Sequence, residues 1–222
     1  MVSKYKRLSL SILIAFVIVV LVFIFGYFYD SSKISSLSNT LQGYEQNLNQ
    51  LELAALLINS NSTFSCNFLT SNLDTLSNQL QTLSRELSNS NLASSEVNYS
   101  QLNDQYTYVR VDYWLLSNRI NQLCGNKFVT AMLIYSINGQ DNVVEGDELS
   151  FLSSKNSSFI VSAVDGNLNL PLVNLLEKSY NISNSSLPAL IIDGKYVKSG
   201  YMDTIGIENY ICSKAKCLNF SG

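Results

Sequence analysis

The sequence predicts a C-terminal α/β domain on an all-α three-helix stalk, preceded by one N-terminal transmembrane helix. Three observations lead to this prediction. A charge-free apolar run occupies residues 8–29, apolar residues then recur every three or four positions as far as residue 123, and β-prone runs alternate with helical stretches from residue 127 onward. We therefore divide the 222 residues into a basic end and anchor (1–30), a three-helix antiparallel, coiled-coil-like bundle (31–125) and an α/β domain (126–222).

Composition excludes several classes of function. The net charge is -3 and only 14% of residues are charged, so the chain offers no broad basic surface for nucleic acid. The sequence contains no His, which excludes His-ligated metal sites and His-based catalytic triads. We expect no cofactor and no nucleic-acid partner.

The apolar run at residues 8–29 predicts a membrane anchor. At 1.5 Å per residue it covers about 33 Å, enough for a hydrocarbon core of about 30 Å. Lys4, Lys6 and Arg7 precede it, so the positive-inside rule predicts a single-pass protein with a cytoplasmic N-terminus and an extracytoplasmic C-terminal domain. The alternative is a cleaved signal peptide, which the length of the run and the lack of a small-x-small cleavage site disfavour.

Glycosylation sequons add little to this prediction. With this content of Asn, Ser and Thr, chance alone gives about five Asn-x-Ser/Thr triplets, so the extracellular compartment depends on the anchor. The triplets begin at Asn61, Asn98, Asn156, Asn181, Asn184 and Asn219.

Three series of apolar residues predict the bundle, because a three-four spacing places each series on one face of a helix. Polar segments at 59–63 and 88–91 separate the series. The series are Ile34, Leu37, Leu41, Tyr44, Leu48 and Leu51; Cys66, Leu69, Leu73, Leu76, Leu80, Leu83 and Leu87; and Leu102, Tyr106, Val109, Tyr113, Leu116, Ile120 and Leu123.

The registers of the three series agree when the chain is folded back at the polar segments. Tyr44 then lies opposite Leu80, and Leu80 opposite Val109, and every other seam residue also meets a seam residue. The alternative is an intermolecular coiled coil, which leaves a homo-oligomer through the stalk open.

The same folding brings Cys66, near the start of the second helix, beside Cys124, just after the third. In an oxidising compartment we expect a disulfide between them, and otherwise two buried thiols.

Residues 126–222 predict a compact α/β unit in the order β-α-β-α-β-β-α. Asp193 and Gly194 stand between two β-prone runs, a pattern typical of a tight hairpin. The expected strands are 128–135, 159–164, 187–192 and 195–198, and the expected helices are 144–154, 170–180 and 203–212.

This C-terminal region resembles the thioredoxin-like superfamily, particularly its extracytoplasmic disulfide-oxidoreductase relatives. The resemblance covers residues 128–211 and is carried by the segments 164–165, 170–182, 187–195 and 200–201. It implies a cis bond before Pro188, with the preceding Leu187 presenting its backbone to a bound peptide. The peptide groove that it implies is formed by Leu187, Pro188, Ser136, Asn138 and Gly139.

One departure from that superfamily bears on activity. Its relatives carry Cys-x-x-Cys after the first strand, where a helix N-terminus lowers the thiol pKa, whereas residues 136–142 contain no Cys. We therefore expect no catalytic residue and no dithiol chemistry at this position.

Cys212 and Cys217 form a second pair, near the end of the last expected helix. Two Cys without His make a poor zinc site, so we expect no metal and a local disulfide. A redox-active pair and free thiols are the alternatives.

These features favour a membrane-anchored protein that displays a redox-inactive thioredoxin-like domain on a helical stalk for binding a protein or peptide. The expected partners are membrane lipid around residues 8–29 and an extracytoplasmic protein or peptide. The alternatives are a thiol-disulfide oxidoreductase or redox chaperone using Cys212 and Cys217, and a purely structural oligomeric spacer.

Overall fold

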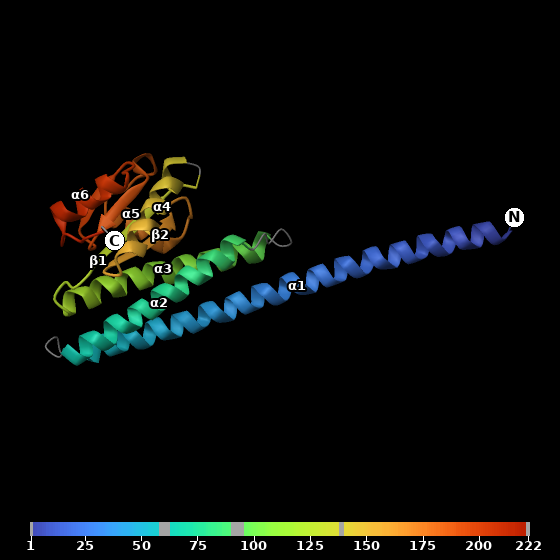
Figure 1. Ribbon diagram of the computed structural model, residues 1–222, viewed down its shortest axis with the longest axis horizontal. Helices are drawn as coiled ribbons and strands as arrows, with labels where there is room; N and C mark the ends of the chain where they lie inside the picture. Colours follow the sequence, from blue (N-terminus) through green and yellow to red (C-terminus); the bar gives the residue numbers. More distant parts are fainter. Residues whose placement is uncertain (1, 58–62, 90–95, 138–139, 221–222) are drawn as a thin grey trace.

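The computed structural model of the protein describes residues 2–57, 63–89, 96–137 and 140–220 (Figure 1). Within the first helix it describes the side chains of residues 16–22, 24 and 32–57. The helices are α1 (Val2–Leu57), α2 (Thr63–Asn89), α3 (Glu96–Leu123), α4 (Gln140–Lys155), α5 (Pro171–Ser179), α6 (Thr204–Lys214) and the 3₁₀ helix η1 (Asn184–Ser186), and the strands are β1 (Val129–Tyr135), β2 (Phe159–Asp165), β3 (Ala189–Ile192) and β4 (Tyr196–Ser199).

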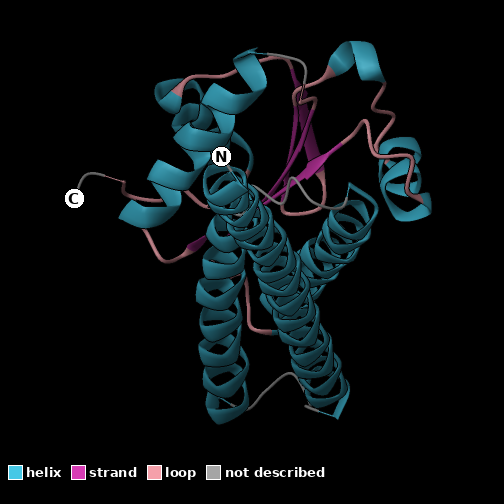
Figure 2. Ribbon diagram, turned by 90° about the vertical axis from the view of Figure 1, so that its right-hand side faces the viewer, coloured by secondary structure: helices cyan, strands magenta, loops and turns pink. Residues whose placement is uncertain are grey.

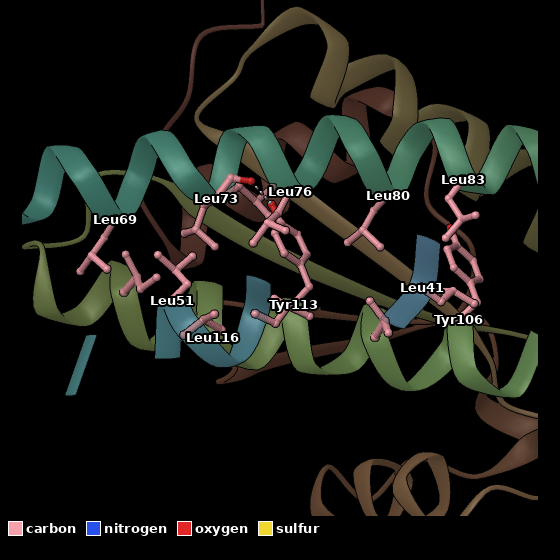
Figure 3. Close-up of a cluster of buried hydrophobic side chains, with 14 of the residues drawn as sticks. Leu41, Leu51, Leu69, Leu73, Leu76, Leu80, Leu83, Tyr106, Tyr113 and Leu116 are labelled. Atoms are coloured by element: carbon pink, nitrogen blue, oxygen red, sulfur yellow. Dashed lines mark hydrogen bonds between the residues drawn. The ribbon is translucent and has the colours of Figure 1, made fainter. Parts of the chain in front are cut away.

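Helices α1, α2 and α3 share one apolar core, which Figure 3 shows in close-up. The seam residues of the three predicted series are buried there, except Tyr44 and Leu123, which are partly buried against the same core, and Ile34, which is half-buried outside it. The hydroxyl of Tyr44 donates to the backbone O of Gln79 (3.5 Å), and that of Tyr113 to the O of Leu73 (3.4 Å). The predicted three-helix packing is therefore present, while the polar segments between its helices lie mostly outside the described residues.

The prediction of a transmembrane helix is corrected by the structure. Among the described residues, no helix combines the length and the apolar character needed to cross a bilayer. The anchor over residues 8–29 and the single-pass membrane localisation are thus contradicted, and the other side chains of that run lie outside the described residues.

The four described strands form one mixed sheet in the order β2-β1-β3-β4. β1 pairs parallel with β2, and the β1–β3 and β3–β4 pairs are antiparallel. Asp193 and Gly194 form the tight hairpin between β3 and β4, with φ of 50° and 62°. The order of strands and helices agrees with the prediction, although α4 begins earlier, at Gln140, and η1 has no counterpart in it.

Helices cover both faces of the sheet, giving three layers. Leu149 and Leu152 of α4 and Ile207 and Ile211 of α6 are buried against one face. On the other face the covering helices are α5 and, from the bundle, α3. Val111 and Trp114 of α3 are fully buried there.

The bundle is therefore not a stalk that holds the α/β domain at a distance. α3 contributes one face to the bundle core and another to the sheet, so the two cores adjoin side by side (Figure 2). The expected domain boundary at residues 125–126 separates α3 from β1 along the sequence. In space, however, α3 contributes residues to both cores. The free end of α1 extends well beyond both (Figure 1).

Buried polar side chains fasten α3 to the sheet. Asn121 donates to the backbone O of Phe128 (2.7 Å) and accepts from its N–H (3.1 Å). The hydroxyl of Thr130 donates to Asn118, and that of Ser162 donates to the backbone O of Arg110 (3.0 Å). Each bond satisfies a group that burial would otherwise penalise, and fixes where α3 crosses the strands.

Candidate functional site

The strand directions bring four separate segments together at one edge of the sheet. The parallel strands β1 and β2 both end there, at Tyr135 and Asp165, and the antiparallel β3 begins there, at Ala189. β4 ends opposite Ala189, at Ser199. The loops at 136–137, 166–170, 187–188 and 200–203 therefore meet at what we call the carboxyl edge.

Hydrogen bonds tie the first two of these loops to each other. The side-chain N–H of Asn167 donates to the hydroxyl of Ser136 (2.6 Å), and the backbone N–H of Gly166 donates to the O of Tyr135 (2.8 Å). A Cβ at Gly166 would lie 3.1 Å from Cδ1 of Leu187, so a glycine permits the third loop to pack closely here. Ser136 and Leu187, both named in the sequence-based groove, are thus brought to the same place.

The bond between Leu187 and Pro188 is cis. Pro188 is buried, and its O accepts from the N–H of Gly200 (2.8 Å), which joins the third loop to the fourth. Leu187 is half-buried, and within the described part of the chain neither its backbone N–H nor its backbone O has a hydrogen-bond partner. Asn138 and Gly139, the other two groove residues, lie outside the described residues.

The cysteines lie away from this edge. Cys66 and Cys124 are disulfide-bonded with Cα atoms 5.5 Å apart, and Cys212 is disulfide-bonded to Cys217. Beside Cys217, the Lys216 ammonium donates to the backbone O of Lys127, just before β1 begins. The Cys212–Cys217 pair therefore lies near the opposite edge of the sheet, about 20 Å away at the rise of a seven-residue strand.

A buried carboxyl group, Glu145, lies in the first half of α4 and was not anticipated. Its side chain is fully buried, and neither oxygen has a hydrogen-bond partner among the described residues. Burial raises the pKa of Glu145 to about 7, although the nearby backbone N–H of Met202 offsets part of the effect. The group can therefore exchange a proton near neutral pH.

A cleft of about 840 Å³ was also missed in the sequence. It runs along β2 between the α2–α3 pair and α4. Sequence patterns could not reveal it, because its walls come from separate elements that are far apart in the sequence. No group of three or more potential metal ligands is found in the described part of the chain.

Comparisons with protein-family models, with curated proteins and with solved structures find no match.

Proposed function

We propose that the protein is a non-catalytic binding module whose α/β domain is thioredoxin-like and holds an extended peptide of a partner protein at the carboxyl edge. The observation that carries the proposal is the backbone of Leu187, whose N–H and O have no partner in the described structure although the residue is half-buried. A peptide laid beside Leu187 would satisfy both groups.

The surroundings of Leu187 support a peptide rather than a small molecule. Ser136 and Asn167 form a polar rim on one side, and the exposed Tyr201 follows Gly200 on the other. The element order from β1 to α6 is the order that the sequence predicted for this domain, and it supports the thioredoxin-like part of the proposal.

The positions of the cysteines support the non-catalytic part of the proposal. No Cys occurs at positions 136–142, and the Cys212–Cys217 pair lies near the other edge of the sheet. The full chain should not accelerate insulin reduction by dithiothreitol. Catalysis above background that Cys212→Ser abolishes would instead make the protein a redox enzyme.

Binding is tested by selecting from a random twelve-residue peptide library on the full chain. Asn167→Trp places a bulky side chain beside Ser136 at an exposed position and should weaken the selected peptides about tenfold or more. Lys178→Trp, at an exposed position near the end of α5, is the matched control and should leave affinity unchanged. Equal affinity for both variants would refute the proposed groove.

A further inference from the structure

The second strand offers an edge for pairing that the proposed groove does not use. β2 is the outermost strand next to β1, so one side of its backbone has no neighbouring strand. The N–H of Val129 bonds the O of Ser158, and the N–H of Gly166 bonds the O of Tyr135. Even-numbered residues of β2 therefore face β1, and odd-numbered residues direct their backbone groups outward.

The outward groups are satisfied at the ends of the strand, and at its far end the O of Asp165 accepts from the N–H of Leu168 (3.2 Å). The N–H of Phe159 bonds the O of Asn156 (2.9 Å), and its O accepts from the hydroxyl of Ser153 (2.9 Å). Val161 and Ala163 have no hydrogen-bond partner for either outward group within the described residues. Two N–H and two C=O groups thus remain open, in the spacing that an added strand would match.

These groups open into the cleft of about 840 Å³. β2 forms its floor, α2 and α3 one wall, and α4 the other. Because successive residues of an added strand point to opposite faces, their side chains would alternate between the two walls. The α4 wall is made of small polar residues, including Ser150, Ser154 and Asp147.

The wall formed by α3 carries a cation, Arg110. Tyr106, one turn before it, is 8% exposed and lines the cleft, but its hydroxyl is buried in the bundle core. The guanidinium of Arg110 lies 5.3 Å from the centre of the Tyr106 ring and forms no ion pair with a described carboxylate. Arg110 therefore presents a positive charge beside the open strand edge, and Asp74 of α2 and Asp147 of α4 also line the cleft.

A second copy of this chain does not fit the cleft. For two β2 strands to pair, each would have to enter between the α2 and α4 of the other molecule while carrying its own flanking helices. A single extended segment has no such obstacle, because a strand needs only about 4.8 Å beside its neighbour.

We infer that the β2 cleft binds an extended segment of a partner polypeptide by strand addition. The segment pairs its backbone with Val161 and Ala163 and places an acidic side chain against Arg110. This site is separate from the carboxyl-edge groove and does not depend on it.

The test uses the full chain and a synthetic heptapeptide of alternating Thr and Val with a central Glu, blocked at both ends. Amide hydrogen exchange followed by NMR should show slower exchange at Val161 and Ala163 when the peptide is added. Unchanged exchange at both amides with millimolar peptide overturns the inference. Protection at Leu187 alone overturns it as well, and would leave the carboxyl-edge proposal standing.

Two variants separate backbone pairing from other modes of binding. Ala163→Pro removes one outward N–H without touching the bonds to β1 and should weaken the peptide about tenfold, whereas Ala163→Val retains the N–H and is the control. Replacing the central Glu by Gln should weaken binding to the native chain about tenfold, but not binding to Arg110→Gln. Equal affinity of the Pro and Val variants for the Glu peptide would overturn strand addition.

Discussion

At the scale of single residues, Glu145 makes the stability of the protein depend on pH. Its pKa in the folded state, about 7, lies above the ordinary 4.5, so the folded state binds more protons than the unfolded state between these values. The contribution of Glu145 to stability is therefore most favourable below pH 4.5, falls as the pH rises towards 7, and is constant above that. Asp193, whose pKa burial also raises, acts in the same direction.

Glu145→Gln should accordingly stabilise the protein at pH 8, by up to about 3 kcal/mol, and have little effect at pH 4. Urea unfolding at the two pH values measures this difference. The exposed Asp147, two positions further along α4, supplies the control Asp147→Asn. If Glu145→Gln increased the free energy of unfolding equally at both pH values, the raised pKa of Glu145 would be contradicted.

Gly166 controls the packing behind the proposed groove. A Cβ there would lie 2.9 Å from Cγ2 of Ile134 and 3.1 Å from Cδ1 of Leu187, so Gly166→Ala should cost about 1–3 kcal/mol and displace Leu187. Gly43→Ala is the matched control, because nothing lies within 4 Å of its Cβ and alanine favours the helix by about 1 kcal/mol. The midpoint of thermal unfolding should fall for Gly166→Ala and rise for Gly43→Ala. Midpoint shifts of the same sign would exclude close packing at Gly166.

At the scale of elements, α3 shows which of its contacts could be predicted from the sequence and which could not. The apolar seam through Tyr106, Tyr113 and Ile120 predicts its contact with α1 and α2, because such a seam has one preferred partner face. The second face, with Val111, Trp114 and Asn118, was not recognised. Its residues follow helical spacing too, but the face combines apolar and amide side chains, and only the position of the sheet shows that the amides bond to strands.

The candidate site at the carboxyl edge, like α3, could be predicted only in part from the sequence. The Asp193–Gly194 turn and the segment at Leu187 follow local rules of turn chemistry, so their positions could be read directly. The bond from Asn167 to Ser136 and the open edge of β2 depend on strand order and on which helix covers which face. Patterns in short stretches of sequence contain information neither on strand order nor on which helix covers which face.

The two disulfides should contribute unequally to stability. Cys66 and Cys124 join α2 to the end of α3 across 58 positions, and Cys212 and Cys217 are only 5 apart. By loop entropy the first should stabilise by about 4 kcal/mol and the second by about 2 kcal/mol. Denaturant unfolding of the two paired Cys→Ser variants tests this, and an equal or reversed loss would show that loop closure does not govern their contributions.

At the scale of the whole molecule, the double role of α3 couples the bundle to the sheet. A helix that loses its bundle partners also loses the geometry that seats Trp114 against β1 and β3, because one rigid helix carries both faces. We therefore expect the two cores to unfold in one transition. Trp114 is the only tryptophan, is fully buried at the sheet and reports on that interface, whereas far-ultraviolet ellipticity reports mainly on the helices.

Leu80→Asp tests this coupling, because it places a carboxylate in the bundle core, and Leu80 is not among the residues packed around Trp114. We expect the free energy of unfolding to fall by several kcal/mol. The unfolding midpoints measured by Trp114 fluorescence and by ellipticity should fall together. Leu53→Asp is the control, since Leu53 is 60% exposed on α1 and its replacement should shift neither midpoint. If Leu80→Asp lowered the ellipticity midpoint alone and left the Trp114 transition in place, the sheet would be an independent unit, and α3 would need only its contacts with the strands to stay folded.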